Sequence, residues 1–282
     1  VDALAAHDVL GVEVVADGAV HRFDTPEKRS GNKAGWYVIP TSEVAVFGFW
    51  HTGHKETVTL TGHQDPAAAE AARKAAKRAQ DENYAERKRI QSEAAQRAQR
   101  LWEMGSEPDP NHNYLLRKGI QPGRARQRGH GIMLDVRGFD GNIYSLQFIK
   151  GDGSKTLLSG GAKMAKFVFV GGPDDVQRVL ICEGWATGRT LLEADPTATV
   201  LAAIDAGNLQ KVAEGARTYW PHADIVVCGD DDRQTPGNPG ATKVREAALA
   251  AGAQVAFPQW PPGAPEGLTD FNDLANWLRR AS

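Results

Sequence analysis

The chain has 282 residues, of which 41% are hydrophobic and 24% charged, proportions typical of a globular protein with a substantial core. Its net charge of −2 argues against indiscriminate binding to nucleic acid, and no apolar stretch approaches the length of a membrane span. No signal peptide is visible, and the two cysteines, Cys182 and Cys228, lie in apolar runs, so we expect a cytoplasmic protein without a membrane partner or a disulfide. Two cysteines cannot supply a zinc ribbon, so we also expect no zinc.

The charge is unevenly distributed along the chain. Residues 61–130 carry 14 Lys and Arg against 9 Asp and Glu, a difference of +5. Residues 181–282 carry 8 against 13, a difference of −5. A basic middle beside an acidic end suits a polyanion held next to a metal site, although charged helix surfaces alone would give the same asymmetry.

The chain begins with segments that predict a small β-rich unit over residues 1–62. Strand character at 36–39 and 44–50 alternates with turn signals that contain Gly, Pro and Asn.

A helical connector is predicted next, over residues 63–130. Residues 66–104 are rich in Ala, Glu, Lys, Arg and Gln, which favours a long helix with few apolar anchors. The proline-containing segment 107–111 ends that helix. A helical turn at 112–118 and a basic loop at 119–131 follow. The long helix is either a basic arm along a nucleic acid or a solvated helix.

The remainder, residues 131–282, predicts an α/β core. Short strands come first, and from residue 176 onward strands alternate with helices, which favours a parallel sheet with flanking helices. The predicted strands are 132–136, 143–149, 166–170, 178–182, 199–204, 224–228 and 254–258, and the predicted helices are 186–194, 208–218, 241–251 and 270–280. We therefore divide the core into a β-rich subdomain, 131–175, and an α/β domain, 176–282.

Acidic residues follow two of these strands. Asp230, Asp231 and Asp232 come after the strand at 224–228, and Glu183 directly follows 178–182. Ligands collect at the carboxyl ends of parallel strands, and carboxylate oxygens suit Mg²⁺. Asp230 and Asp232 are two apart, so they point the same way while Asp231 faces elsewhere. The pattern predicts a metal site for phosphoryl-transfer chemistry, and the alternative is a group of turn and cap residues.

Three nearby segments are candidates for the same site. Gly184 allows a sharp turn into the next helix, a position suited to phosphate. The loop 233–240 is either a flexible connection or a lid whose Arg233 contacts phosphate. The segment 267–273, with Asp270, either extends the acidic site or caps the last helix.

Several motifs in this order resemble a known family. Residues 182–188 resemble an "EGxAT" segment, and a Glu-Gly motif followed by an Asp-x-Asp motif in alternating strand–helix units looks like a Toprim domain. The closer resemblance is to the DNA primases of phages and conjugative plasmids. Further matching segments are 21–23, 35–38, 47–53, 114–119, 145–149, 206–209, 229–232, 238–240 and 269–274.

This resemblance implies roles for particular residues. Glu183, Asp230, Asp232 and Asp270 would hold Mg²⁺ or Mn²⁺, and Glu183 would also assist proton transfer as a primer hydroxyl attacks a nucleoside triphosphate. Lys155 lies in a stretch similar to the "KYLNS" segment of bacterial replicative primases. The residues expected to contact nucleotide or DNA are Lys155, Lys163, Lys166, Arg22, Lys33, Arg124, Arg126, Arg128, Asn208 and Arg233. Trp36 or Trp50 would stack on bases, although for Trp36 a place in the core is the favoured interpretation.

The implied function is synthesis of short primers on single-stranded DNA. Bacterial replicative primases differ in having Asp where Thr187 stands, Asn where Leu158 stands, and an amino-terminal zinc ribbon. Template recognition is therefore assigned to the amino-terminal β unit or to a missing segment, and unwinding to a helicase in a separate chain or a missing segment. The alternatives are a Toprim nuclease or topoisomerase-like strand breaker, and a non-catalytic nucleic-acid-binding module.

Overall fold

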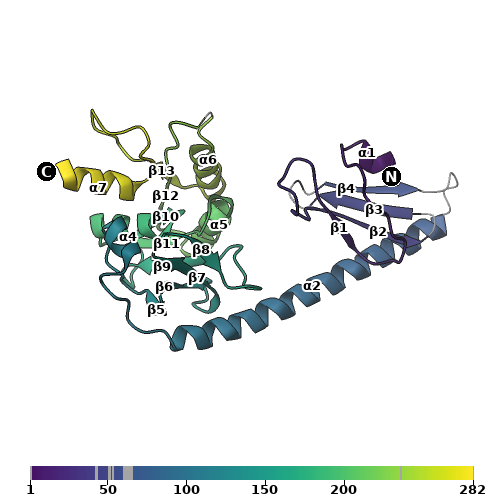
Figure 1. Cartoon of the computed structure of the whole chain (residues 1–282), viewed down its shortest axis with the longest axis horizontal. Coiled ribbons are helices and arrows are strands. Elements are labelled where there is room, and N and C mark those ends of the chain that lie inside the picture. Colours follow the sequence, from purple (N-terminus) through teal and green to yellow (C-terminus); the bar gives the residue numbers. More distant parts are fainter. Residues whose placement is uncertain are drawn as a thin grey trace. The chain divides into compact units, whose positions relative to one another are not determined.

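The computed structural model describes residues 2–41, 44–49, 52, 54–59, 66–235 and 237–281. It divides the chain into two compact units, Val1–Lys88 and Arg89–Ser282, which we call unit 1 and unit 2 (Figure 1). Trp50, one of the two tryptophans expected to stack on bases, lies outside the described residues. In the described part of the chain, no helix combines the length and the apolar character needed to cross a bilayer.

Unit 1 is built on a four-stranded antiparallel sheet, with the strands in the order in which they occur in the chain. The strands are β1 (His21–Phe23), β2 (Gly35–Thr41), β3 (Val44–Phe49) and β4 (His54–Thr59), and a short helix α1 (Asp2–Ala5) precedes them. Phe23, Tyr37, Phe47 and Phe49 form the core on one face together with Leu4 of α1. The predicted β-rich unit is thus a sheet whose amino-terminal segment covers one face.

Trp36 packs on the other face of this sheet. Its ring lies against the cluster of Val38, Val44 and Val46 and only 3.0 Å from where a Cβ on Gly48 would stand. Of the two alternatives for Trp36, the structure supports the core aromatic.

The polar helix predicted at 66–104 is α2 (Pro66–Glu103). Ion pairs one turn apart line its surface, such as Lys74 with Glu70 and Arg89 with Glu93. Its last turns differ, because Ala98 and Trp102 are buried in a cluster with Met133 and Leu146 of unit 2. The carboxyl-terminal part of α2 therefore belongs to the core of unit 2.

In residues 89–235 and 237–281, nine strands form one mixed sheet with the order β13-β12-β10-β11-β9-β6-β7-β8, and β5 pairs with β6. The strands are β5 (Arg126–Arg128), β6 (Gly131–Arg137), β7 (Ile143–Lys150), β8 (Lys155–Leu157), β9 (Phe167–Gly171), β10 (Arg178–Cys182), β11 (Thr199–Ala202), β12 (Asp224–Cys228) and β13 (Gln254–Ala256). The pairs β10–β11, β10–β12 and β12–β13 are parallel, and the other pairs are antiparallel. The α/β fold is confirmed, and the antiparallel strands continue the same sheet.

Helices cover both faces of this sheet. They are α3 (Asn113–Lys118), α4 (Trp185–Ala194), α5 (Leu209–Tyr219), α6 (Pro239–Ala251) and α7 (Phe271–Ala281), with a short 3₁₀ turn η1 (Ala206–Asn208) before α5. Along β10, Leu180 and Cys182 face a core that includes α4, whereas Val179 and Ile181 face a core shared with α5 and α6. This alternation explains why the buried parallel strands are apolar throughout.

One local prediction needs correction. The basic loop expected at 119–131 contains a strand, β5, because Arg126 pairs across the sheet with Met133 and its guanidinium donates to the carbonyl oxygen of Trp102. The structure also has an edge strand that the sequence does not predict, β8 at Lys155–Leu157, beside β7.

Candidate active site

The acidic residues lie at a topological switch point of the sheet. The chain leaves β10 through α4 and continues to β11 on one side of β10, while β12 pairs with the opposite side of β10. A topological switch point of this kind leaves a crevice beyond the carboxyl ends of β10 and β12. The register places Cys182 beside Cys228, so Glu183 and Asp230 emerge next to each other.

A pocket of about 220 Å³ lies at these strand ends. Glu183, Asp230 and Asp232 all line it, together with Lys243 of α6. The three carboxylates that the sequence analysis singled out thus converge on one cavity.

The electrostatics of this pocket favour a bound cation. Burial raises the pKa of Asp230 to about 7, and the charges of Asp270, Glu183 and Asp232 contribute to this rise in that order. In the described part of the chain, no group forms a hydrogen bond with the buried Asp230 Oδ1. A buried carboxylate oxygen without a donor is costly, so this atom needs a ligand.

Glu183 is also held in an acid-rich environment. Burial raises its pKa, the charge of Asp205 raises it further, and Lys155 acts in the opposite direction. Lys155 Nζ lies 3.8 Å from where a Cβ on Gly184 would stand, so the ammonium group is beside the Glu183–Gly184 turn. The sequence analysis identified Lys155 but missed Asp205, although Asp205 also follows a parallel strand, β11.

Asp231 points away from the pocket, as its position between Asp230 and Asp232 predicts. Its carboxylate accepts hydrogen bonds from Asn238 Nδ2 at 2.8 Å and from Trp260 Nε1 at 3.0 Å. Asn238 Oδ1 in turn accepts from the backbone N–H of Asp232 and from that of Ala241, which caps α6. Asp231 and Asn238 therefore fix the turn that presents Asp232.

The amino terminus of α6 approaches this turn closely. A Cβ on Gly240 would stand 2.8 Å from Asp232 Oδ2. Any larger residue at this position would push against a pocket carboxylate, which explains the glycine.

Asp270 caps the last helix, which is one of the two roles that the sequence left open. Its Oδ1 accepts from the backbone N–H of Asp273 at 2.8 Å at the start of α7, and Asp273 accepts from Thr269 N at 3.2 Å. The charge of Asp270 contributes to the raised pKa of Asp230, but Asp270 does not line the pocket, and its role as a metal ligand stays a prediction.

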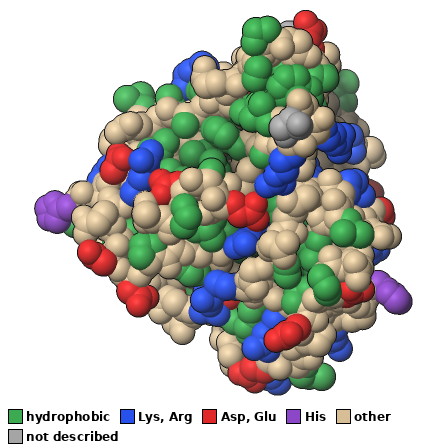
Figure 2. All heavy atoms as spheres, turned by 90° about the vertical axis from the view of Figure 1, so that its left-hand side faces the viewer, with side chains coloured by type: hydrophobic (Ala, Val, Ile, Leu, Met, Phe, Trp, Pro, Cys, Tyr) green, Lys and Arg blue, Asp and Glu red, His purple; other side chains and the backbone are tan. Residues whose placement is uncertain are grey.

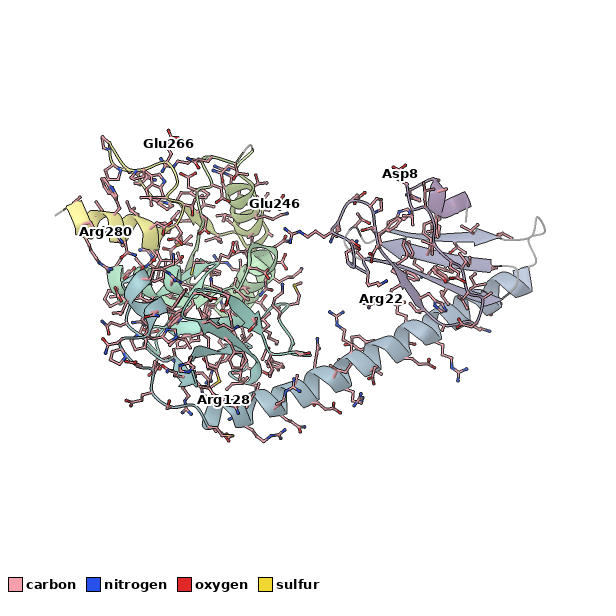
Figure 3. The ribbon with its side chains drawn as sticks, viewed as in Figure 1. Asp8, Arg22, Arg128, Glu246, Glu266 and Arg280 are labelled. Carbon is pink, nitrogen blue, oxygen red and sulfur yellow. The ribbon has the colours of Figure 1, made fainter. Side chains whose placement is uncertain are left out.

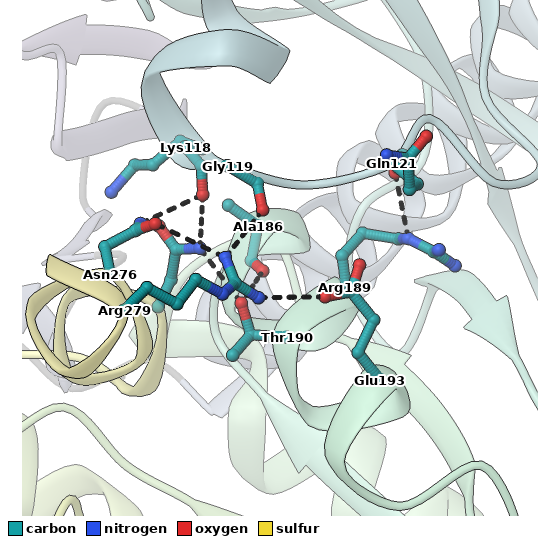
Figure 4. Close-up of polar contacts among 10 residues, drawn as sticks. Lys118, Gly119, Gln121, Ala186, Arg189, Thr190, Glu193, Asn276 and Arg279 are labelled. Atoms are coloured by element: carbon teal, nitrogen blue, oxygen red, sulfur yellow. Dashed lines mark hydrogen bonds and ion pairs between the residues drawn. The ribbon is translucent and has the colours of Figure 1, made fainter. Parts of the chain in front are cut away.

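A polar network holds α7 in place (Figure 4). Asn272 and Asn276 both donate to the carbonyl oxygen of Lys118 at the end of α3, at 2.8 and 3.0 Å, and Asn272 also donates to Thr190 of α4. Arg279 binds the carbonyl oxygen of Gly119 and the carboxylate of Glu193. The network joins α3, α4 and α7, and so positions Asp270 at the beginning of α7.

Tyr114 is a second residue that the sequence analysis missed as part of the site's surroundings. Its side chain is 2% exposed, its ring stacks on Trp185, and within the described residues its hydroxyl has no hydrogen-bond partner. Burial and the charge of Asp270 raise its pKa to about 12, so the hydroxyl is neutral. The resemblance covers the segment 114–119 but gives Tyr114 no role, because an aromatic residue on a short helix is typical of a core.

The other predicted lysines and Asn208 lie on the flank of the site. Lys163 forms an ion pair with Asp205, whereas the Lys166 ammonium lies 3.7 Å from the centre of the Tyr144 ring. Asn208 is completely buried, and its side chain bonds to the backbone of Ala203, Lys163, Ala165 and Lys166. The structure supports a positioning role for Asn208, because its hydrogen-bonding groups are already engaged.

The predicted arginines are spread over several elements. Arg233 donates to the carbonyl oxygens of Pro265 and Leu268 and stacks on Trp260, so it holds the loop before α7. Arg124 lies over the Phe169 ring, Arg126 bonds to the end of α2, and Arg128 is exposed on β5 (Figure 3). On the side of unit 2 that carries α7, acidic and basic side chains are interspersed (Figure 2).

Arg22 and Lys33 belong to unit 1 (Figure 3). Arg22 is exposed on β1, and Lys33 lies 4.0 Å from Asp24. Their expected contact with DNA stays a prediction.

The residues of the pocket fit a divalent cation. Glu183, Asp230 and Asp232 offer hard oxygen ligands, and Asp230 Oδ1, without a partner among the described residues, provides a free lone pair. A cation would also lower the raised pKa values of Asp230 and Glu183, because it favours their charged forms.

Comparisons with known proteins agree with this site. Residues 178–279 match the Toprim domain family. Two relatives, each named DNA primase TraC from Escherichia coli, are 36% identical to the chain. One aligns over 271 residues, 90% of this chain and 25% of the relative, and the other over 278 residues, 89% and 18%. The chain thus spans a quarter or less of the length of these relatives.

Solved primase structures align more distantly. The primase fragment of the bacteriophage T7 primase-helicase protein gives a TM-score of 0.44 at 20% identity and covers 60% of this chain and 72% of that one. The DnaG primase catalytic domain bound to single-stranded DNA gives 0.43 at 14% identity, with 70% and 78% covered.

Residues 178–279 of the chain are a Toprim domain, since they match the model of that family. Over nine-tenths of its length the chain is a relative of DNA primase TraC. The predicted resemblance to primases of the plasmid type is confirmed.

Proposed function

We propose that this chain is the catalytic part of a DNA primase, which synthesises short primers from nucleoside triphosphates on single-stranded DNA. The observation that carries the proposal is the convergence of Glu183, Asp230 and Asp232 in one pocket at the end of β10 and β12, with Asp230 Oδ1 unpartnered among the described residues. The similarity to DNA primase TraC over nearly the whole chain supports the same activity.

The proposed mechanism assigns each pocket residue a task. Glu183, Asp230 and Asp232, with Asp270 nearby, would hold Mg²⁺ or Mn²⁺, and the bound cation would supply positive charge to neutralise the triphosphate and the charge that develops at the α-phosphate. The Asp231–Asn238 pair keeps Asp232 turned toward the pocket.

The chain's own groups position the nucleotide and move the proton. Lys155 contacts the triphosphate from beside Gly184. Glu183, which lines the same pocket, accepts the proton of the primer hydroxyl. The bond that forms joins the primer oxygen to the α-phosphorus, and the bond to pyrophosphate breaks.

The partners follow from this assignment. Single-stranded DNA is the template, unit 1 with Arg22 and Lys33 is its first contact, and a helicase on another chain or segment unwinds the duplex. The cytoplasm is the proposed location.

Replacing Arg22 or Lys33 should reduce the salt dependence of DNA binding. The slope of the logarithm of the binding constant against the logarithm of the salt concentration should become shallower by about 0.7 for each phosphate that is no longer neutralised.

The test compares primer synthesis by the wild type, Asp230→Asn and Glu183→Gln on single-stranded DNA with Mg²⁺ or Mn²⁺. We expect both variants to lose activity by about 100-fold or more, because each removes a charge that holds the cation. Asp224→Asn is the matched control, since Asp224 lies at the opposite end of the same strand, β12, and pairs with Arg178 and Gln254.

Unchanged synthesis by Asp230→Asn would contradict the proposal. Nicking of plasmid DNA without nucleotides would favour a strand breaker. Metal-independent DNA binding without polymerisation would favour a binding module.

A further inference from the structure

Three possible metal ligands meet in unit 1, in a cluster that the proposed function does not use. His54 and Glu56 are two apart on β4 and therefore face the same side of the sheet. His7 follows α1, which covers that side. One ligand atom from each of the three residues lies within 4.8 Å of the others.

His7 Nε2 forms a long hydrogen bond with Glu56 Oε2, and the distances in the cluster are also compatible with coordination of a metal. Both imidazoles approach the same oxygen, with His7 Nε2 3.3 Å and His54 Nε2 3.5 Å from Glu56 Oε2. Charge-assisted hydrogen bonds are typically about 2.7–2.9 Å long. In the same unit, His21 Nε2 makes such a bond at 2.8 Å with Asp17.

Ligand atoms around a tetrahedral metal are farther apart than hydrogen-bonded atoms. With metal–ligand bonds of about 2.0–2.1 Å, neighbouring ligand atoms are separated by roughly 3.3–3.4 Å. The separations of His7 Nε2 and His54 Nε2 from Glu56 Oε2, 3.3 and 3.5 Å, are close to this value.

The surroundings hold the two rings in this arrangement. The His7 ring packs edge-on against Phe47 and Phe49, and the His54 ring stacks on Phe49. The centres of the two imidazoles are 4.9 Å apart. The side chains of His7, His54 and Glu56 are 34, 39 and 41% exposed, so a fourth coordination position can open to water.

We propose that His7, His54 and Glu56 form a second metal site, which binds Zn²⁺ or a similar first-row transition metal. Two imidazoles and one carboxylate are a ligand set that suits zinc. The bound metal fastens the amino-terminal segment to β4. Zinc was not expected because two cysteines cannot form a zinc ribbon. The site proposed here uses no cysteine ligand.

The experiment uses the full chain after treatment with a chelator. Zn²⁺ binding is measured by equilibrium dialysis in excess Mg²⁺, which occupies the acidic pocket of unit 2, and the gain in melting temperature of unit 1 is followed in parallel. We expect about one Zn²⁺ per chain and a higher melting temperature. His7→Gln and His54→Gln should each weaken binding at least about tenfold and abolish the gain.

Two further variants make the result decisive. His21→Gln removes an imidazole from the same unit but outside the cluster, so it should bind Zn²⁺ as the wild type does. Glu56→Gln keeps an oxygen that accepts hydrogen bonds but removes the charge, so it should lose binding even if a histidine variant fails to fold.

The proposal would be overturned by any of three results: wild-type affinity in Glu56→Gln, no Zn²⁺ bound by the wild type, or an equal loss in His21→Gln. Each outcome is independent of primer synthesis.

Discussion

At the residue scale, Asp230 makes the stability of the metal-free protein depend on pH. The folded state keeps its proton up to a pKa of about 7, while the unfolded state releases it near the ordinary value of 3.8. Below about pH 4 both states are protonated and the raised pKa has no cost. As the pH rises toward 7, the folded state binds more protons than the unfolded state, so the free energy of unfolding falls.

We therefore expect Asp230→Asn to be more stable than the wild type at about pH 8 in a chelator, by roughly 2–4 kcal/mol. The gain should vanish near pH 4. Urea denaturation at both pH values measures it, and Asp224→Asn at the other end of β12 should show no such gain. An equal gain at both pH values would show that the charge of the buried carboxylate is not its cause.

Asn208 gives a second prediction at this scale. Replacing it with Ala leaves the backbone carbonyls of Ala203, Lys163 and Lys166 without their donor, in a fully buried position. We expect a loss of about 2–4 kcal/mol, seen as a lower midpoint of urea denaturation with an unchanged slope.

Gln210→Ala provides the control for this substitution. Its exposed side chain bonds to Glu214 one turn along α5, so the effect should stay within about 0.5 kcal/mol. A similar loss in both variants would argue against a special role for Asn208.

The individual residues also show where sequence reasoning stops. Glu183, Asp230 and Asp232 were predictable, because acids directly after apolar strands must gather at one edge of a parallel sheet. The sequence analysis predicts that Asn208 and Arg233 contact nucleotide or DNA, whereas in the structure both side chains donate hydrogen bonds to backbone carbonyl oxygens. The local sequence does not show which hydrogen-bond partner a polar side chain will have in the folded protein. Asp205 and Tyr114 depend on contacts between distant segments.

At the scale of single elements, the turn after α3 helps to position α7. Gly119 ends α3 with φ +59, and a Cβ there would stand 2.6 Å from Asn276 Oδ1. Gly119→Ala should therefore cost backbone strain of about 1–2 kcal/mol and, in addition, displace Asn276 from the network that holds α7.

Gly129→Ala separates the two effects. Gly129 has nearly the same φ, +58, but no described atom lies within 4 Å of the place that its Cβ would take. We expect its thermal stability to fall less than that of Gly119→Ala, and only Gly119→Ala to weaken metal binding through Asp270. Equal losses in both would assign the whole effect to the backbone.

The elements were more predictable than their assembly. The helices and parallel strands appear close to their expected ranges, because long periodic segments and apolar runs are local signals. The antiparallel pairing of β9 with β11 joins the β-rich segment to the α/β part in one sheet. Such pairing links residues that are far apart in the chain, and no local pattern encodes it.

At the scale of the whole molecule, the two units have separate cores. Unit 2 includes the end of α2, since Ala98 and Trp102 pack on Met133 and Leu146. We expect a fragment of residues 89–282 to fold by itself, with cooperative thermal unfolding and with Mg²⁺ or Mn²⁺ binding like that of the full chain. A fragment that begins at 105 lacks these packing interactions and should unfold at a lower temperature. Failure of the longer fragment to fold would show that unit 2 depends on unit 1.

The two neighbouring cysteines could report on motions of the protein. Cys182 and Cys228 lie side by side on β10 and β12 as free, buried thiols, each just before an acidic turn. Burial raises the pKa of Cys182 well above its usual range and that of Cys228 to about 12, so little reactive thiolate exists while the strands stay paired. The rate at which a thiol reagent labels the unmodified protein would therefore depend on how often β10 and β12 separate. A cation bound at the ends of these strands would stabilise their pairing and slow the labelling.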